Sequence, residues 1–197
     1  MEPISIIVSY CVPLEAEHVD TDQIIPARFL KATTREGFGD NLFRDWRYHS
    51  DGSPKESFVL NQPGVKGRIL IAGKNFGCGS SREHAAWALY DHGFRVVISS
   101  FFADIFKNNA LNNGLLPIQL DEAFVQQLFS LRKQDPELEL QVDLPNQTVT
   151  VVSTQEQVKF DINDHKKSCL LQGFDDIDYL INQKDQVLAF EQERKTI

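Results

Sequence analysis

One stretch, residues 73–89, constrains the fold more than any other part of this 197-residue sequence. It reads GKNFGCGSSREHAAWAL and follows a short apolar segment, residues 68–72, that is typical of a buried strand. Glycines at positions 73, 77 and 79 interrupt regular structure after that segment, and a helical pattern follows the serines at 80 and 81. The stretch therefore predicts a strand, a glycine-containing loop and a helix, in that order.

The start of the predicted helix has the composition of an anion-binding turn. Ser80 and Glu83 are spaced as in a capping box, in which Ser80 would accept a hydrogen bond from the Glu83 amide. Glycine permits a positive φ and a close approach of a ligand to the backbone, and a helix N-terminus offers free N–H groups. A guanidinium can hold a carboxylate or phosphate by two parallel hydrogen bonds. We expect an anion to bind the turn formed by Gly77, Gly79, Ser80, Ser81 and Arg82.

Three motifs together resemble a known family. Residues 75–85, NFGCGSSREHA, are similar to the signature of the swivelling domain of the aconitase superfamily. With HVDTDQIIP at 18–26 and FADIF at 102–106, the chain resembles the small subunits of 3-isopropylmalate dehydratases over nearly its whole length. The resemblance implies an α/β fold, a compact three-layer β/β/α swivelling domain as in the C-terminal domain of aconitase.

The resemblance also implies roles for individual residues. Ser80 would be the catalytic base, acting as an alkoxide, and Ser81 and Arg82 would bind substrate oxygens. Asp22, in the pair Thr21-Asp22, would lie in the active site, although such a cluster before Ile24 otherwise serves as a turn and helix cap. An arginine about a dozen residues later would bind a substrate carboxylate. Arg35 is the nearest match, with Arg28 and Arg44 as alternatives.

The reaction implied is the interconversion of 2-isopropylmalate and 3-isopropylmalate, by dehydration and rehydration, in leucine biosynthesis. Moving the hydroxyl requires a base, electrophilic help for the leaving hydroxide and clamps for the carboxylates. In the family the electrophile is a [4Fe-4S] cluster on the large subunit. We expect this chain to bind no metal or cofactor of its own and to be active only with that large subunit and its diacid substrate.

Two alternatives stay open. The small subunit of a related hydro-lyase, homoaconitase or citraconate hydratase, would share the turn at 79–82 and differ in the loop near Arg35. A phosphate-binding module would use the glycines as a cradle, but the chain lacks G-x-x-x-x-G-K-[ST], and its glycine spacing does not fit G-x-G-x-x-G.

Composition limits the possible partners and compartment. The excess of 28 acidic over 20 basic residues argues against a general nucleic-acid or anionic-membrane binder. No window approaches the roughly 18 apolar residues of a membrane span, and the start lacks the basic residues of a signal peptide, so we expect a cytoplasmic protein. Cys11, Cys78 and Cys169 are odd in number and far apart, which favours reduced thiols over a disulfide framework. They also lack the close spacing of iron–sulfur ligands.

The order of elements predicts a single domain over residues 1–197. Strand and helix patterns alternate between 68 and 120, which indicates parallel strands with right-handed crossovers, and residues 138–152 indicate a hairpin. By resemblance, the polar and aromatic stretch at about 31–61 includes the substrate-recognition loop, but the sequence does not show which residue meets the isopropyl group. The predicted strands are 4–10, 68–72, 94–98, 115–120, 138–142, 148–152 and 158–160, and the predicted helices 82–92, 101–111, 121–133, 165–172 and 183–194.

Overall fold

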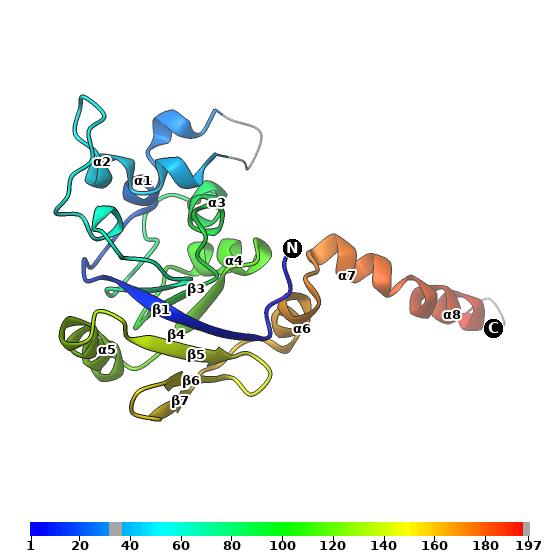
Figure 1. Ribbon diagram of the computed structural model, residues 1–197. Helices are drawn as coiled ribbons and strands as arrows, with labels where there is room; N and C mark the ends of the chain where they lie inside the picture. The colour runs from blue at the N-terminus through cyan, green and yellow to red at the C-terminus, as the bar shows by residue number, and fades with distance from the viewer. Residues whose placement is uncertain (32–36, 195–197) are drawn as a thin grey trace.

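A computed structural model describes residues 1–31 and 37–194 and contains a curled seven-stranded sheet with helices on both sides (Figure 1). The strand order is β4-β3-β2-β1-β5-β6-β7. Pairing is parallel from β4 to β1 and antiparallel from β1 to β7. The strands are β1 Ile6–Leu14, β2 Ile69–Ala72, β3 Val96–Ser99, β4 Leu116–Gln119, β5 Glu139–Asp143, β6 Thr148–Val151 and β7 Gln157–Lys159.

β1 divides its length between two half-sheets. Residues 6–10 pair with β5 in the antiparallel half, and residues 11–14 pair with β2 in the parallel half. The sequence predicted a strand that ends at residue 10, whereas β1 continues to Leu14, so the predicted end was wrong. Cys11 N donates to Leu138 O over 3.1 Å, on the edge of β1 that faces β5. Pro13, two residues later, has its nitrogen on the same edge, where β5 has already ended and no N–H donor is needed. The strand can therefore continue through a proline.

The core has two apolar clusters, one on each face of the parallel half-sheet. Ile69 and Ile71 of β2 pack with the antiparallel strands and with α5, Glu122–Gln134. Leu70 and Ala72, which point to the opposite face, pack under α3, Glu83–His92, and α4, Asp104–Asn112. Because successive side chains of a strand face opposite sides, four apolar residues in a row serve both clusters. The result is the three-layer β/β/α arrangement predicted from the sequence.

The predicted β-α-β-α-β order is confirmed. α3 connects β2 to β3, and α4 connects β3 to β4, in a parallel arrangement. α3 ends at Gly93, whose φ of 114° gives the left-handed C-cap that glycine tolerates best. The hairpin β5–β6 and the strand β7 are also confirmed. α4 begins at Asp104, three residues after the predicted start, because residues 101–103 lie extended beside the glycine loop.

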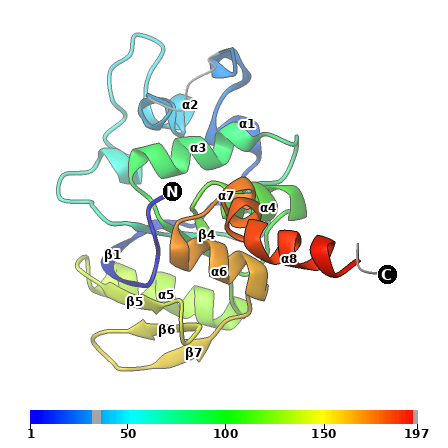
Figure 2. The ribbon, with the colours of Figure 1, turned by 90° about the vertical axis from the view of Figure 1, so that its right-hand side faces the viewer.

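The segment between β1 and β2 contains only short helices in its described part. They are α1 Thr21–Ile24, η1 Ala27–Phe29, η2 Gly39–Asn41, α2 Arg44–Arg47 and η3 Val59–Asn61. Phe43 is fully buried and stacks on Trp46 with their ring centroids 5.7 Å apart. Figures 1 and 2 both place α1, α2 and α3 on the same side of the sheet. Much of the predicted recognition loop is therefore packed against the body.

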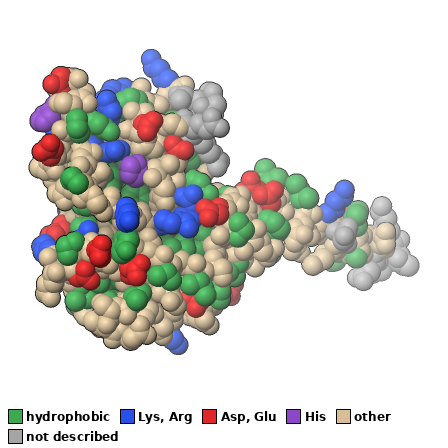
Figure 3. All heavy atoms as spheres, in the orientation of Figure 1, with side chains coloured by type: hydrophobic (Ala, Val, Ile, Leu, Met, Phe, Trp, Pro, Cys, Tyr) green, Lys and Arg blue, Asp and Glu red, His purple; other side chains and the backbone are tan. Residues whose placement is uncertain are grey.

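Three helices end the chain: α6 Asp164–Gln172, α7 Asp176–Asn182 and α8 Lys184–Arg194. α7 was not predicted from the sequence. In Figure 1, α7 and α8 form an arm that extends away from the body, and Figure 3 shows hydrophobic side chains on it. Ile177, Leu180 and Ile181 of α7 are each more than 60% exposed. None of the helices in the described part of the chain is both long enough and apolar enough to span a membrane.

Candidate active site

The candidate site is the loop of residues 73–82, which follows the carboxyl end of β2 and is fastened to a second segment, residues 18–21. His18 N donates to Lys74 O over 2.8 Å, and Gly77 N donates to Val19 O over 2.8 Å. Thr21 N donates to Cys78 O over 2.9 Å. The same loop meets a third segment, because Phe76 N donates to Phe101 O and Ala103 N donates to Phe76 O. The three motifs that carry the family resemblance therefore meet in space.

Two glycines make this contact possible. Gly77 has a φ of 77°, and a Cβ built there would lie 2.2 Å from Cγ of Phe106. Gly79 has a φ of 90°, and its Cβ would lie 3.2 Å from Cβ of Asp20. A side chain at Gly77 would be both strained and blocked, whereas at Gly79 the backbone conformation is the main obstacle. The glycines are therefore needed for contacts between segments of the chain itself. The sequence interpretation explained them by the close approach of a ligand.

The predicted capping box at Ser80 is wrong. The N-cap of α3 is Arg82, no side chain caps it, and the helix begins at Glu83. The carboxylate of Glu83 instead accepts a hydrogen bond from Asn113 Nδ2 over 2.9 Å, at the end of α4. Ser80 and Ser81 lie before the helix with exposed side chains, and their hydroxyls make no hydrogen bond within the described residues. Both hydroxyls are therefore available to solvent or to a ligand.

Arg82 forms an ion pair with Asp22 through Nη1 and Oδ1. The Arg82 side chain is mostly buried, whereas that of Asp22 is half exposed. Asp22 also accepts a hydrogen bond from Ala27 N over 2.8 Å. The hydrogen bond from Arg82 is the main reason that the pKa of Asp22 lies below its ordinary value, and the Ala27 amide adds to it. Two predicted site residues from distant parts of the sequence thus lie in contact, and an anion that binds Arg82 would compete with Asp22.

The residues next to Asp22 act structurally. Asp20 is the N-cap of α1 and forms a capping box with Gln23, as the sequence allowed for this cluster. Thr21 is buried, and its hydroxyl donates to the carbonyl of Ser80 over 2.9 Å. The segment 18–21 and the loop 73–82 are therefore joined by a side-chain hydrogen bond as well as by backbone hydrogen bonds.

The three arginines considered for the carboxylate clamp differ in their surroundings. Arg28 donates to both carboxylate oxygens of Asp45, over 3.0 Å to Oδ2. Arg44 lies over the ring of Tyr48, with Cζ 4.1 Å from the ring centroid, and has no carboxylate partner in the described part of the chain. Arg28 and Arg44 line an open polar cleft of about 770 Å³. Arg35 lies outside the described residues.

Sequence reasoning missed one pair in the loop. Asn75 has a φ of 60°, a left-handed conformation that asparagine tolerates better than most residues, and its Nδ2 lies 3.0 Å from Nδ1 of His18. The Sγ of Cys78 lies 3.3 Å from the carbonyl oxygen of His18, so the thiol donates to the backbone. Burial is the largest cause that raises the pKa of Cys78, followed by the charge of Asp20. The only signal in the sequence was that His18 begins one motif and Asn75 begins another.

The three cysteines are free thiols in three separate elements: Cys11 in β1, Cys78 in the glycine loop and Cys169 in α6. Burial raises the pKa of Cys11 to about 12, so this thiol is not ionised near neutral pH. An iron–sulfur cluster is held by several thiolates that converge on one place. The donor set of the glycine loop, a single partly exposed thiol, does not fit such a cluster.

Comparisons with known proteins agree with this geometry. The model of the Aconitase C-terminal domain family matches residues 1–123. A 3-isopropylmalate dehydratase small subunit from Cytophaga hutchinsonii is 58% identical over 99% of this chain and 97% of its own length. One from Roseiflexus castenholzii is 53% identical over 97% of this chain and 94% of its own. A crystal structure of 3-isopropylmalate dehydratase from Methanocaldococcus jannaschii is similar with a TM-score of 0.67 and 26% identity, covering 95% of this chain and 99% of that one.

Proposed function

This chain belongs to the 3-isopropylmalate dehydratase small subunit family, with an aconitase-type swivelling domain, and we propose that it is the small subunit of a hydro-lyase that interconverts 2-isopropylmalate and 3-isopropylmalate in leucine biosynthesis. The observation that carries the proposal is the ion pair of Asp22 with Arg82, which directly follows the exposed serines Ser80 and Ser81 in the loop. Relatives of full length with this name support the choice of substrate. The chain acts as a single domain over residues 1–197.

Ser80 serves as the base for the carbon-bound proton next to a substrate carboxylate. A serine hydroxyl is a weak acid, so its ionised form needs nearby positive charge. The Arg82 guanidinium, two residues later, is such a charge, and the partial positive charge at the start of α3 is another. Because no hydrogen bond of the described chain occupies Ser80 Oγ, the hydroxyl is free to act on a substrate.

Ser81 and Arg82 bind substrate oxygens, and Asp22 sets the position of Arg82 until the substrate arrives. A guanidinium that holds a carboxylate through two hydrogen bonds fixes its orientation as well as its charge. A second arginine clamps another carboxylate. Arg35 fills this role by its place in the motif, and Arg44, which has no carboxylate partner in the described chain, is the alternative.

The electrophile comes from a partner. A [4Fe-4S] cluster on the large subunit supplies a Lewis acid for the departing hydroxyl. The chain's three thiols lie in separate elements and do not form a site for this cluster, which supports its location on the other subunit. The role of this chain is therefore to hold the substrate carboxylates and to move the proton at Ser80. We infer a cytoplasmic complex, with no nucleic-acid or membrane partner, from the acidic net charge and the free thiols.

The test is reconstitution with the large subunit under anaerobic conditions. We expect the mixture to interconvert 2-isopropylmalate and 3-isopropylmalate and to hydrate citraconate, followed by absorbance of the unsaturated diacid. Neither chain alone should do so. Full activity of this chain by itself would overturn the proposal. A mixture that prefers homoaconitate, or that acts on citraconate but not on 2-isopropylmalate, would reassign the chain to homoaconitase or citraconate hydratase.

A further inference from the structure

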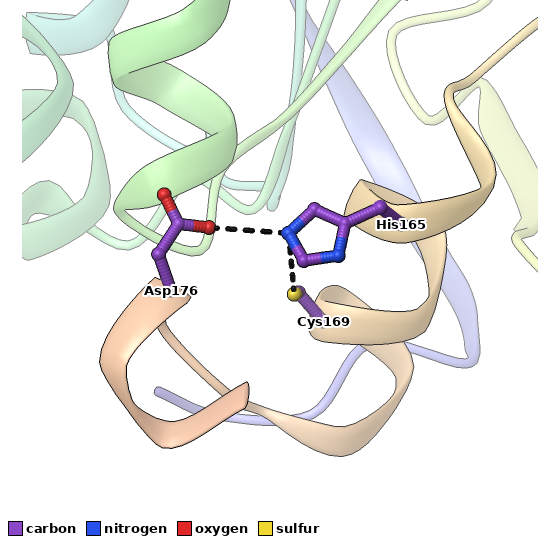
Figure 4. A group of neighbouring side chains, drawn as sticks. All are labelled: His165, Cys169 and Asp176. Carbon is purple, nitrogen blue, oxygen red and sulfur yellow. Dashed lines mark hydrogen bonds and ion pairs between the residues drawn. The ribbon is translucent and has the colours of Figure 1, made fainter. Parts of the chain in front are cut away.

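Three side chains of different chemistry meet where α6 is followed by α7, at the base of the arm. They are His165 and Cys169 of α6 and Asp176, the first residue of α7 (Figure 4). One ligand atom from each lies within 4.8 Å of the others. The proposed reaction uses none of these residues. Imidazole, thiolate and carboxylate are also the ligand types that zinc binds in proteins.

The local structure explains why these residues converge. His165 and Cys169 are four residues apart on a helix, so their side chains lie on the same face. α6 ends at Gly173, whose φ of 72° lets the chain turn, and a Cβ there would lie 2.5 Å from the carbonyl oxygen of Met1. The chain then enters α7 through a capping box between Asp175 and Asp178. This tight connection places the carboxylate of Asp176 beside α6.

Two of the three separations match those of a tetrahedral zinc site. With zinc bonds of about 2.0–2.1 Å to nitrogen and oxygen and about 2.3 Å to sulfur, tetrahedral angles place the ligand atoms about 3.3 Å apart for N and O and about 3.6 Å for S and N. Nε2 of His165 lies 3.4 Å from Oδ1 of Asp176, and Sγ of Cys169 lies 3.8 Å from Nε2 of His165. Both agree with these separations to about 0.2 Å.

The third separation, between sulfur and oxygen, has to shorten from as much as 4.8 Å by about 1 Å. Asp176 is the ligand placed to make this movement, since its side chain is half exposed at the first turn of a helix that leaves the body. Cys169 is buried and His165 is partly exposed, so the other two ligands stay with α6.

We propose that His165, Cys169 and Asp176 bind one zinc-class divalent ion, with water as the fourth ligand. The expectation from sequence was a chain that binds no metal of its own. The site uses one helical pair and one residue from the next helix, a pattern that depends on the turn at Gly173. Its effect is to fix the first turn of the arm to α6.

Lys166 sets the charge balance of the site. Its Nζ lies 2.5 Å from Oδ1 of Asp176 and donates to Oδ1 of Asn112 over 2.7 Å. A carboxylate has about four lone-pair positions, so Asp176 can accept from Lys166 and still bind an ion. A bound ion displaces the proton of the Cys169 thiol, so the thiolate and the Asp176 carboxylate together match the charge of a dication. Lys166 and the neighbouring Asp175 add one charge of each sign.

The experiment is a titration of the untagged full chain with Zn²⁺ by calorimetry and with Co²⁺ by absorption spectroscopy. We expect one equivalent of metal to bind and Co²⁺ to show a thiolate-to-metal charge-transfer band. His165→Phe keeps a ring against Tyr179, whose centroid lies 4.3 Å from that of His165, but removes the ligand nitrogen. It should weaken Zn²⁺ binding at least about 100-fold, because the loss of a residue that only supports a metal ligand already costs up to that much affinity. Cys169→Ala should abolish the charge-transfer band.

Cys78→Ala and His49→Ala are the matched controls, since they remove a thiol and an imidazole at exposed or half-exposed positions elsewhere. Both should bind Zn²⁺ as the unchanged chain does. If Cys169→Ala fails to fold, His165→Phe still decides the question, because His165 is not part of the core. The proposal is overturned if the unchanged chain binds Zn²⁺ no better than the His165→Phe variant does. It is also overturned if Cys78→Ala removes the charge-transfer band.

Discussion

The hydroxyl of Thr21 donates to the main-chain carbonyl of Ser80 over 2.9 Å, across 59 residues of sequence. This bond links α1 to the residue that we propose as the base. Thr21 is 2% exposed, so the donor end of this bond is shielded from water. The position of Ser80 therefore depends on a side chain with no part in the chemistry.

Thr21→Val keeps the shape of the side chain and removes the donor. We expect the free energy of unfolding to fall by about 0.5–1.5 kcal/mol, the net contribution of one hydrogen bond. Turnover with the large subunit should fall as well, since Ser80 is less firmly placed. Thr21→Ser, which keeps the hydroxyl, is the control and should retain most of the turnover. Urea denaturation and the coupled assay measure the two effects, and full turnover by the valine variant would contradict this role.

Ser80→Ala should abolish turnover of the assembled enzyme without affecting stability. The structure gives Ser80 no capping hydrogen bond, so the change in unfolding free energy should stay within about 0.5 kcal/mol, as for other surface substitutions. Assembly with the large subunit should be preserved, which size-exclusion chromatography measures. Ser81→Ala should instead raise KM and leave measurable turnover. A loss of stability of about 1 kcal/mol with turnover intact would point to a helix cap and not to a base.

Gly77→Ala and Gly52→Ala separate strain from crowding. Both glycines have similar φ values, 77° and 86°, but Gly52 has nothing within 4 Å of a built Cβ, whereas Gly77 has Phe106 at 2.2 Å. Gly52→Ala should cost about 1–2 kcal/mol, the price of the left-handed conformation alone. Gly77→Ala should cost clearly more, by a further 1–3 kcal/mol for overpacking. Denaturation midpoints measure both, and equal losses would show that Phe106 moves aside.

The carboxylate clamp can be identified by comparing Arg28→Met, Arg35→Met and Arg44→Met in the assembled enzyme. A lost charged hydrogen bond costs about 1.5–3 kcal/mol, or roughly 10- to 150-fold in kcat/KM. We expect that loss for Arg35→Met. Arg28→Met should have little effect, because Asp45 already occupies that guanidinium. If Arg44→Met shows the loss and Arg35→Met does not, the clamp is Arg44.

His92 should make the fold less stable below neutral pH. Burial, reinforced by the charge of Arg47, holds the pKa of His92 below its ordinary value. The unfolded chain therefore takes up a proton near pH 6.5 while the folded chain does not. Stability is fully present above about pH 6.5 and falls as the pH drops toward the lower folded pKa, by at most about 1.4 kcal/mol per pH unit for one proton.

His92→Gln should flatten the loss of stability between pH 7.5 and 5. His49→Gln, at an exposed position, is the control and should leave the slope unchanged. Urea denaturation at several pH values measures the slopes. An unchanged slope in His92→Gln would show that other groups cause the acid sensitivity.

The parts of the fold that follow from local pattern were predictable. The glycine loop between β2 and α3, the parallel crossovers and the β5–β6 hairpin all rest on apolar periodicity and on turn residues that lie close together in sequence. The predicted helix 82–92 ends where α3 ends, directly before Gly93. The predicted fold class is confirmed because it depends on these local signals and on their order.

The errors come from contacts between distant residues. A capping box at Ser80 fits the local sequence, but Glu83 is bound by Asn113, thirty residues later. β1 runs on through Pro13 because β5 no longer pairs with it there, although β2 still does on the other edge, which only the assembled sheet reveals. The family resemblance placed Asp22 and Arg82 in one site, but their ion pair was not predicted, since sixty residues separate them.

β1 lies between partners that follow it at very different distances along the chain: β2 begins at residue 69 and β5 at residue 139. During translation, one edge of β1 has no native neighbour until residue 143 has emerged from the ribosome. An open strand edge readily pairs with another chain. Chain fragments that end between these two points would therefore leave this edge of β1 open and would be prone to aggregate.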